Sequence, residues 1–305
     1  MTSRTPNTFV VGAGPVATAL AGALRTGGVP VLGLWARRPA AARHAGAVAG
    51  VASYSAAPPD LLLEADAVLL CVRDGAIAEV ARTLIATGMI SKKHVLLHCS
   101  GALSAADVFA DVRDRVGGVA TLHPLRAMAD GRTAMRELAG TMFGIEGDEG
   151  GLHVARDLVA ALGGRALELR GERMAAYHAA AAMASNYVVA LLDAAVTLLG
   201  TSGVPAEDAA VALGSLAAGA VANVSEHGTV AGLTGPIRRG DRATVARHLE
   251  VLPGELRPLY CELGLRTVEL ARRIEGAEAP SADDLKAIEQ LLRGEAPVVR
   301  RANSR

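Results

Sequence analysis

The sequence predicts an α/β domain built on a doubly wound parallel sheet, followed by a second domain that is all helical. Three observations lead to this prediction. The chain has 305 residues, which is enough for about two domains. Its first half alternates short apolar runs with alanine-rich helical patterns, and after Gly171 helical periodicity continues alone. We therefore expect domains at 1–172 and 173–305.

Apolar runs in the first half predict the strands in order, at 8–12, 30–35, 66–72, 94–98, 118–122 and 141–146, with a shorter one at 165–169. Helical patterns lie between several of them, at 15–26, 75–87 and 103–114. Continuous apolar strands are typical of a parallel sheet that is covered on both faces. Glycine and proline breaks divide the helical second half, at Gly203–Pro205, Gly235–Pro236, Pro253 and Pro280.

One helical segment, residues 174–199, is apolar nearly all round and long enough to cross a membrane. It also contains His178, Ser185, Asn186 and Asp193, which would be costly in lipid. We therefore expect a central helix buried on all sides, in a homodimer, rather than a membrane span.

Composition and charge exclude several classes of protein. The 31 basic residues balance the 31 acidic ones, which argues against a nucleic-acid partner. Hydrophobic residues make up 51% of the chain, more than a disordered protein carries. Three scattered cysteines without a CxxC pair predict neither a disulfide framework nor a zinc or other metal site. The N-terminus lacks a secretion-signal pattern, so we expect a cytoplasmic protein.

A glycine motif follows the first expected strand and opens the first helix. Gly12 permits a tight turn, Gly14 lets the backbone approach a pyrophosphate, and Ala17 allows close packing of helix on strand. The helix N-terminus adds N–H groups and a positive dipole end. The alternative is a glycine turn that merely packs. We favour a Rossmann-type dinucleotide site formed by Gly12, Gly14, Pro15, Val16 and Ala17.

The residues after the second strand bear on which dinucleotide binds. NAD enzymes usually place a carboxylate here for the ribose hydroxyls, but this chain has no Asp or Glu before Asp60. Arg37 and Arg38 stand there instead, and their planar guanidinium groups suit a 2′-phosphate. The alternative is compositional bias, since only three of the 31 basic residues are lysines. We expect NADP.

Polar residues follow three neighbouring strands. Ligands of open parallel sheets bind beyond the carboxyl ends of the strands. We expect Val72 and His98 to contact the cofactor, and Ser100 and His123 to act in catalysis. The alternative is that each is a satisfied structural residue. Cys99 is expected to be inert, because nothing nearby in the sequence except a histidine could lower its pKa.

The apolar helix of the second half carries its own polar residues. His178 and Ser185 are seven residues apart and so lie within about 20° around a helix, and Asn186 is about 80° from His178. With Tyr177, these residues form a polar side that could close over a nicotinamide. The alternative is a hydrogen-bonded seam between helices in the core.

A second polar stretch, LTGPIRRGD, contains Thr234 and Arg238. Arg238 or Arg239 could hold a substrate carboxylate through two hydrogen bonds, and we expect Thr234 to bind substrate as well. The alternative is a solvated helix start with an Arg–Asp pair. No lysine falls in any of these segments, so histidine is the natural proton donor near neutral pH.

Together the strings GAGPVA, HCSGALS, LHPLRAM, YHAAAAMASN and LTGPIRRGD, spread over about residues 7–275, carry a family resemblance. The chain resembles bacterial NADP oxidoreductases that join a Rossmann-like domain to a helical domain of unknown function, number 2520. The helical half is similar in kind to those of 6-phosphogluconate dehydrogenase, ketopantoate reductase, prephenate dehydrogenase and pyrroline-5-carboxylate reductase. That similarity implies dimerisation and substrate closure by the helical domain. The chain departs from the lysine-using members.

These observations lead us to expect an NADPH-dependent reductase that passes a hydride to a small carbonyl or imine substrate, a ketopantoate-like 2-oxo acid being the first candidate. His178 or His123 would donate the proton, while Ser100 and Asn186 would orient the acceptor. Two alternatives stay open. One is an NADP-binding sensor or regulatory protein without turnover, and the other is a prephenate-type NADP dehydrogenase.

Overall fold

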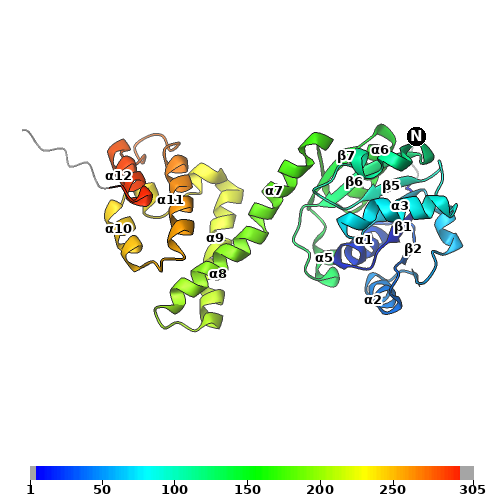
Figure 1. The fold of residues 1–305 in the computed structure, drawn as a ribbon, viewed down its shortest axis with the longest axis horizontal. Coiled ribbons are helices and arrows are strands. Elements are labelled where there is room, and N and C mark those ends of the chain that lie inside the picture. The colour runs from blue at the N-terminus through cyan, green and yellow to red at the C-terminus, as the bar shows by residue number, and fades with distance from the viewer. Residues whose placement is uncertain (1–4, 296–305) are drawn as a thin grey trace, which may run out of the picture. The chain divides into compact units, whose positions relative to one another are not determined.

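The computed structural model describes residues 5–295, and contacts within the chain divide it into two compact units, Met1–Ser185 and Asn186–Arg305 (Figure 1). Helix α7 (Met174–Ala184) belongs to the first unit. The expected domains 1–172 and 173–305 rest on where the sequence pattern changes, just before α7, and that boundary stays a prediction.

The first unit is built on one eight-stranded sheet with the strand order β3-β2-β1-β4-β5-β6-β7-β8. Strands β1 to β6 are parallel, whereas β7 runs antiparallel to β6, and β8 is parallel to β7. The predicted sheet is therefore confirmed, except that its last two strands run the opposite way. The bounds are β1 Thr8–Val11, β2 Val31–Trp35, β3 Ser53–Tyr54, β4 Ala67–Leu70, β5 Val95–His98, β6 Gly118–Pro124, β7 Met142–Gly147 and β8 Arg165–Glu168.

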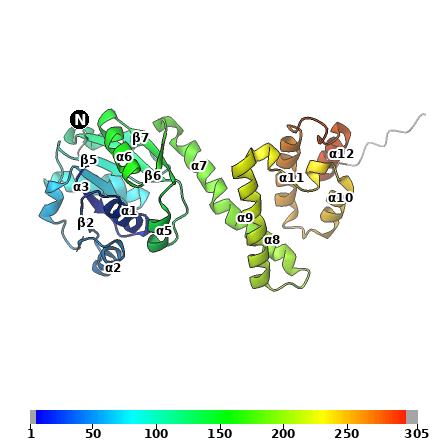
Figure 2. The same ribbon diagram turned by 180° about the vertical axis from the view of Figure 1, so that it is seen from behind.

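Helices cover both faces of this sheet, as the sequence predicted (Figure 2). One buried cluster packs the sheet against α1, α2, α5 and α6, and a second packs its other face against α3, α4 and short 3₁₀ turns. The side chains of successive strand residues alternate between these two clusters, which is what a strand buried on both faces requires. The bounds are α1 Pro15–Thr26, α2 Pro39–Ala49, α3 Ile77–Ala86, α4 Ala105–Val108, α5 Gly131–Glu137 and α6 Glu149–Ala161.

The register of the central strands brings four strand ends to one edge of the sheet. Val11 of β1 pairs with Leu70 of β4, Leu70 pairs with His98 of β5, and His98 pairs with Thr121 of β6. The residues that follow these positions therefore lie side by side, although they are distant in the sequence. This edge carries the candidate site.

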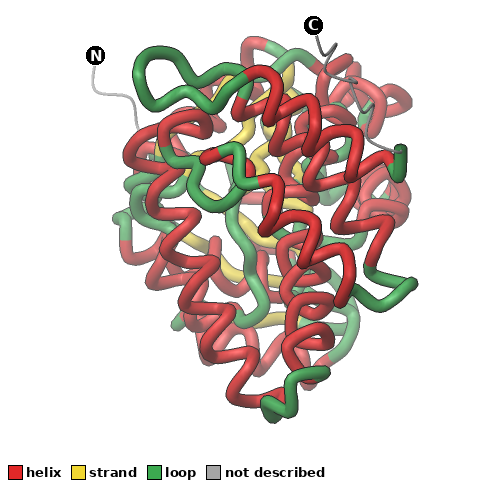
Figure 3. Tube along the Cα trace, turned by 90° about the vertical axis from the view of Figure 1, so that its left-hand side faces the viewer, coloured by secondary structure: helices red, strands yellow, loops and turns green. Residues whose placement is uncertain are grey.

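Within the described residues, the second unit contains helices and 3₁₀ turns but no strand, which agrees with the predicted all-helical architecture (Figure 3). Its helices are α8 Asn186–Gly200, α9 Ala206–Ala231, α10 Arg242–Val251, α11 Arg257–Ala271 and α12 Ala282–Arg293. Buried apolar side chains of α10, α11 and α12, together with Ile237, form its core.

The apolar segment 174–199 differs from its prediction in two ways. It is two helices, because Ser185 leaves helical geometry at φ −124° and ψ −77° between α7 and α8. It is also not buried on all sides within this chain: α8 has no buried residue, and α7 has only Met174. By length and composition, two helical stretches, Gly171–Gly200 and Ala206–Ala231, could cross a membrane.

Candidate functional site

The glycine turn lies between β1 and α1, where the sequence placed it. Gly12 has φ +135°, and a Cβ added there would lie 2.2 Å from the carbonyl oxygen of Cys71. Glycine is therefore required both by the backbone and by the neighbouring strand end. Gly14 has nothing within 4 Å of the position of a Cβ, so the backbone there faces open space.

No side chain among the described residues caps the N-terminus of α1 by a hydrogen bond. Pro15 is its first residue, Gly14 provides no side-chain cap, and the first turn holds no acidic residue. The N–H groups of the first turn and the positive end of the helix dipole are therefore available to an anion. Ala17 is fully buried and lets the helix pack closely on the sheet.

A cavity of about 1130 Å³ opens beside this turn. It is large enough for an extended ligand, since typical small-molecule pockets hold about 300–1,000 Å³. Five of the predicted cofactor residues line it, namely Gly12, Gly14, Arg37, Arg38 and Val72. Pro15, Val16 and Ala17 continue from the same turn into α1.

The far wall of this cavity comes from the residues after β2. Arg37 and Arg38 are exposed and line the cavity, and neither forms an ion pair with another described residue. The one acidic side chain on the wall is Glu79, in the first turn of α3. Trp35 also lines the cavity, and its buried indole Nε1 lacks a hydrogen-bond partner among the described residues. Trp35 and Glu79 were not among the predicted site residues.

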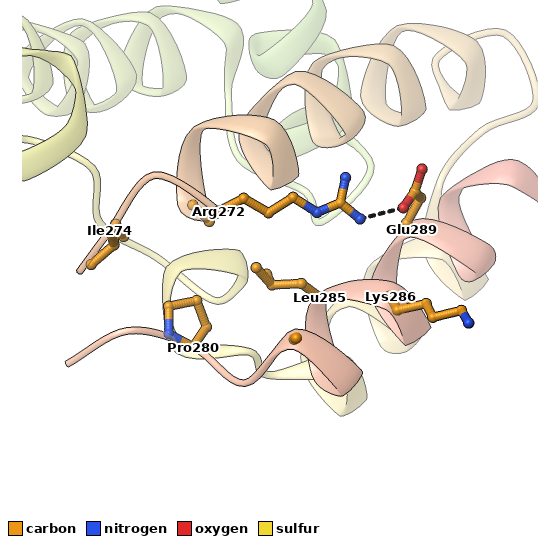
Figure 4. Close-up of a pocket in the computed structure, with 8 residues that line it drawn as sticks. Arg272, Ile274, Pro280, Leu285, Lys286 and Glu289 are labelled. Atoms are coloured by element: carbon orange, nitrogen blue, oxygen red, sulfur yellow. Dashed lines mark hydrogen bonds and ion pairs between the residues drawn. The ribbon is translucent and has the colours of Figure 1, made fainter. Parts of the chain in front are cut away.

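A second cavity, of about 470 Å³, lies in the helical unit between α11 and α12 (Figure 4). Its arginine, Arg272, is paired with Glu289, and Lys286 extends away from that pair. None of the predicted site residues lines this cavity. The candidate site is therefore the one in the first unit.

Two histidines and a tyrosine meet near the end of β6. The Nδ1 atom of His123 is 2.8 Å from the hydroxyl of Tyr177, and the rings of His123 and His178 are 5.9 Å apart. Glycines make this arrangement possible. A Cβ on Gly101 would lie 2.8 Å from His123 Cε1 and 2.9 Å from His178 Nδ1, and a Cβ on Gly144 would lie 2.6 Å from the Tyr177 hydroxyl.

Burial controls the protonation of this cluster. It lowers the pKa of His123 to about 4, and the nearby His178 acts in the same direction, whereas Asp74 opposes them. Burial also raises the pKa of Tyr177. His123 is therefore a neutral imidazole at pH 7 and Tyr177 keeps its proton. His178 is exposed to solvent.

Ser100 connects the end of β5 to the residues after β4. Its hydroxyl donates to Asp74 Oδ2 at 2.9 Å and accepts from the backbone N–H of Ala102 at 3.2 Å. Its own N–H donates to His98 Nδ1 at 3.2 Å. In this arrangement, the hydroxyl proton of Ser100 is held by Asp74.

His98 has no exposed surface and does not line the cavity, so the predicted direct contact with a cofactor is not supported. Burial lowers its pKa to about 4, with Asp74 opposing. Because Nδ1 accepts from Ser100, the ring proton is on Nε2, which lies 3.3 Å from Thr121 Oγ1.

The hydrogen-bond chain continues into the sheet. Thr121 Oγ1 donates to Glu146 Oε2 at 3.2 Å, and the same oxygen accepts from the backbone N–H of Ala105 at 2.8 Å. This chain fixes the ring of His98 and, through it, Ser100. Asp74, Thr121 and Glu146 were not among the predicted site residues. Asp74 could have been found, since it follows the end of β4 by four residues.

The remaining predicted residues belong to the end of the first unit and to the second unit. Ser185 ends α7, while Asn186, Thr234 and Arg238 belong to the second unit. Arg238 Nη2 donates to Glu278 Oε2 at 2.7 Å, so this arginine already has a carboxylate partner. No group of three or more His, Cys, Asp or Glu in the described part of the chain could hold a metal ion.

Comparisons with solved structures give relatives over nearly the whole chain. A protein from Thermotoga maritima, TM1727, is 25% identical over 86% of this chain and 98% of its own, with a TM-score of 0.68. BF3122 from Bacteroides fragilis, provisionally named an NADP oxidoreductase, is 20% identical over 95% and 97% of the two chains, with a TM-score of 0.62. A pyrroline-5-carboxylate reductase from Coxiella burnetii is 14% identical over 95% and 98%, with a TM-score of 0.58.

The last two likenesses show the fold alone. No curated protein matches the chain. A family model does match, the Domain of unknown function (DUF2520), over residues 141–267. The match therefore covers most of the helical part of the chain that begins at α7, together with the last two strands of the sheet, β7 and β8.

Proposed function

We propose that this chain is an NADPH-dependent reductase that passes a hydride to a small carbonyl or imine. One observation carries the proposal. The uncapped N-terminus of α1 opens onto a cavity whose far wall carries Arg37 and Arg38, with no acidic residue between β2 and Asp60. This combination suits the pyrophosphate and the 2′-phosphate of NADP.

The residues present fit that cofactor. Gly14 leaves open space at the helix N-terminus for the pyrophosphate, and the two arginines can bind the 2′-phosphate through paired hydrogen bonds. Bound NADPH would supply the hydride. The fold also supports a reductase, because the similar structure from Coxiella burnetii is a pyrroline-5-carboxylate reductase. We extend this to NADPH, rather than NADH, from the residues of the cavity wall.

We assign the proton donor to His178. His123 is neutral at pH 7, because burial lowers its pKa to about 4, and its Nδ1 can accept from the hydroxyl of Tyr177. His123 therefore orients Tyr177 and the neighbouring ring of His178.

Ser100 takes a different role from the one expected. Its hydroxyl proton is directed to Asp74, so it cannot at the same time donate to a substrate carbonyl. We therefore propose that Ser100 positions Asp74. The predicted roles of Asn186, Ser185, Thr234 and Arg238 in binding substrate stay predictions.

The test is NADPH oxidation, followed by absorbance, with a panel of 2-oxo acids, ketopantoate included, and cyclic imines. We expect turnover, with His178→Ala lowering kcat about 10²–10⁴-fold, as loss of a general acid does. His153→Ala, at an exposed histidine of α6, is the matched control and should keep parental kcat. Tight NADPH binding without turnover on any member would instead favour the sensor. Parental kcat in His178→Ala would contradict the assignment of the proton donor.

We also propose that the chain is a cytoplasmic homodimer. Helices α8 and α9 expose large apolar side chains, among them Tyr187, Val189, Val211 and Leu216 at 63%, 68%, 72% and 70%. Contiguous apolar surface of this kind is rarely left in water by a monomeric protein. A second copy of the chain would cover it, and light scattering of the purified protein in the absence of detergent tests this.

A further inference from the structure

Two cysteine thiols face each other at the edge of the sheet beside the cavity. Cys71 follows β4 and Cys99 follows β5, and the preceding residues, Leu70 and His98, are register partners. Their Sγ atoms are 3.4 Å apart. Neighbouring strands are about 4.7–4.9 Å apart, within the range of about 4.4–6.8 Å between Cα atoms that a disulfide spans.

The pair is partly exposed and touches the glycine turn. Both cysteines are partly exposed, and Cys71 lines the cavity. The backbone of Cys71 is tied to β1, because its N–H donates to the carbonyl of Val11 at 2.8 Å. Its carbonyl oxygen lies against Gly12, where a Cβ would be only 2.2 Å away. A movement of Cys71 therefore reaches the turn directly.

We propose that Cys71 and Cys99 are a peroxide-sensitive thiol pair, which closes to an intramolecular disulfide beneath the glycine turn. This modification site stands independently of the reductase activity. Only its effect on NADPH, described below, rests on the proposed function. Cys99 was expected to be inert, but the fold gives it a thiol partner that sequence separation conceals.

The reaction balances with hydrogen peroxide as the oxidant. The Cys99 thiolate attacks one peroxide oxygen, so that a sulfur–oxygen bond forms and the oxygen–oxygen bond breaks. The hydroxide that leaves takes up the proton that the Cys99 thiol lost and becomes the first water. Cys71 Sγ then attacks Cys99 Sγ, the sulfur–sulfur bond forms, and hydroxide leaves with the Cys71 proton as a second water. Two thiols lose two electrons, and peroxide is reduced to two waters.

The order of attack follows from the contact between the thiols. The hydrogen bond to Cys99, and then burial, raise the pKa of the Cys71 thiol well above its ordinary value. Cys71 therefore keeps its proton, and Cys99 is the partner that reacts first.

Closing the disulfide shortens the Sγ–Sγ distance from 3.4 Å to about 2.05 Å. We expect Cys71 and the end of β4 to shift relative to Gly12, which lies against the Cys71 carbonyl oxygen. We expect oxidation to weaken NADPH binding about tenfold, a common size for coupling between two sites. By reciprocity, saturating NADPH should slow the oxidation of the pair.

The test uses the full chain, treated with hydrogen peroxide, alkylated and digested with trypsin without reduction. Trypsin separates the three cysteines into peptides 44–73, 94–113 and 248–266, so each linkage has its own mass. We expect peptides 44–73 and 94–113 to be joined with loss of two hydrogen atoms, and dithiothreitol to release them. Cys261→Ser should keep this crosslink, while Cys71→Ser and Cys99→Ser should abolish it.

A crosslink between chains, a linkage that includes Cys261, or only sulfinic acid at Cys99 would overturn the proposal. NADPH titration of the reduced and oxidised protein then separates the two ideas. Equal affinity in both forms would overturn the coupling, with the disulfide intact. No binding in either form would overturn the proposed function, and the crosslink measured by mass would still establish the thiol pair.

Discussion

The Gly101→Ala substitution adds one methyl group at the point where the two histidines approach each other. The new Cβ would lie 2.8 Å from His123 Cε1 and 2.9 Å from His178 Nδ1, whereas ordinary contacts begin at about 3.4 Å. Each ring must therefore move by about 0.5–0.6 Å. Because a misplacement of about 1 Å can cost about 10²-fold in rate, we expect kcat to fall about tenfold.

The cofactor cavity should be spared, because Gly101 does not line it. Steady-state kinetics of NADPH oxidation, NADPH titration and thermal unfolding together test this: kcat falls, the Kd for NADPH is unchanged, and the protein stays folded at a cost of about 1–3 kcal/mol. Gly75→Ala is the matched control, since its Cβ would meet nothing within 4 Å. A Gly101→Ala protein with parental kcat would refute the assignment of this cluster as the reacting site.

Two further predictions concern stability and assembly. The folded-state pKa values of His98 and His123, about 4, lie below the ordinary histidine value of 6.5, so the unfolded chain binds protons more readily. The contribution of these two histidines to the free energy of unfolding should be constant above pH 6.5 and should decrease as the pH drops from 6.5 towards 4. Chemical unfolding at several pH values measures this. A pH-independent midpoint across that window would contradict it. Leu216→Glu, on the exposed apolar surface of α9, should convert the dimer to a monomer in light scattering, whereas Val251→Glu, at an equally exposed residue of α10, should leave it dimeric. A monomeric parent, or a parent that requires detergent, would contradict the proposed dimer.

The sequence predicted those parts of the fold that depend on residues close together in the chain. Gly12, Gly14 and Ala17 lie within one turn and its helix, so their spacing alone indicates the motif. The alternation of apolar runs and helices likewise indicates the parallel core of the sheet. The reversed direction of β7 could not be predicted, because strand direction depends on the path of the chain between strands rather than on the strand residues.

The candidate site was only partly predictable for the same reason. Each of His98, Ser100 and His123 follows or ends a strand, so the sheet edge could be inferred. The chain from His98 through Thr121 to Glu146 joins residues on three strands, and nothing in the sequence pairs them. The proximity of Cys71 and Cys99 could not be predicted for the same reason, because these residues come together only through the pairing of β4 with β5.

The apolar segment 174–199 shows a different limit. Its composition indicates that its apolar surface is covered. Composition does not indicate whether the same chain or another molecule covers that surface. In this chain α8 has no buried residue, and we propose that a second copy of the chain covers it. The break at Ser185 was also concealed, because the residues on both sides favour helix and no glycine or proline marks the change.

Calorimetric titration with NADPH and NADH measures whether the cavity binds NADPH through the glycine turn and the two arginines. We predict that the parent binds NADPH more tightly than NADH. Arg37→Ala/Arg38→Ala should lose about tenfold or more in NADPH affinity, since a hydrogen bond to a charged group contributes about 1.5–3 kcal/mol. NADH binding should be unchanged, and Arg43→Ala, an exposed arginine of α2 that does not line the cavity, should match the parent. Equal NADPH binding by the double variant would contradict the role of the arginines, and no binding of either nucleotide by the parent would contradict the cofactor site itself.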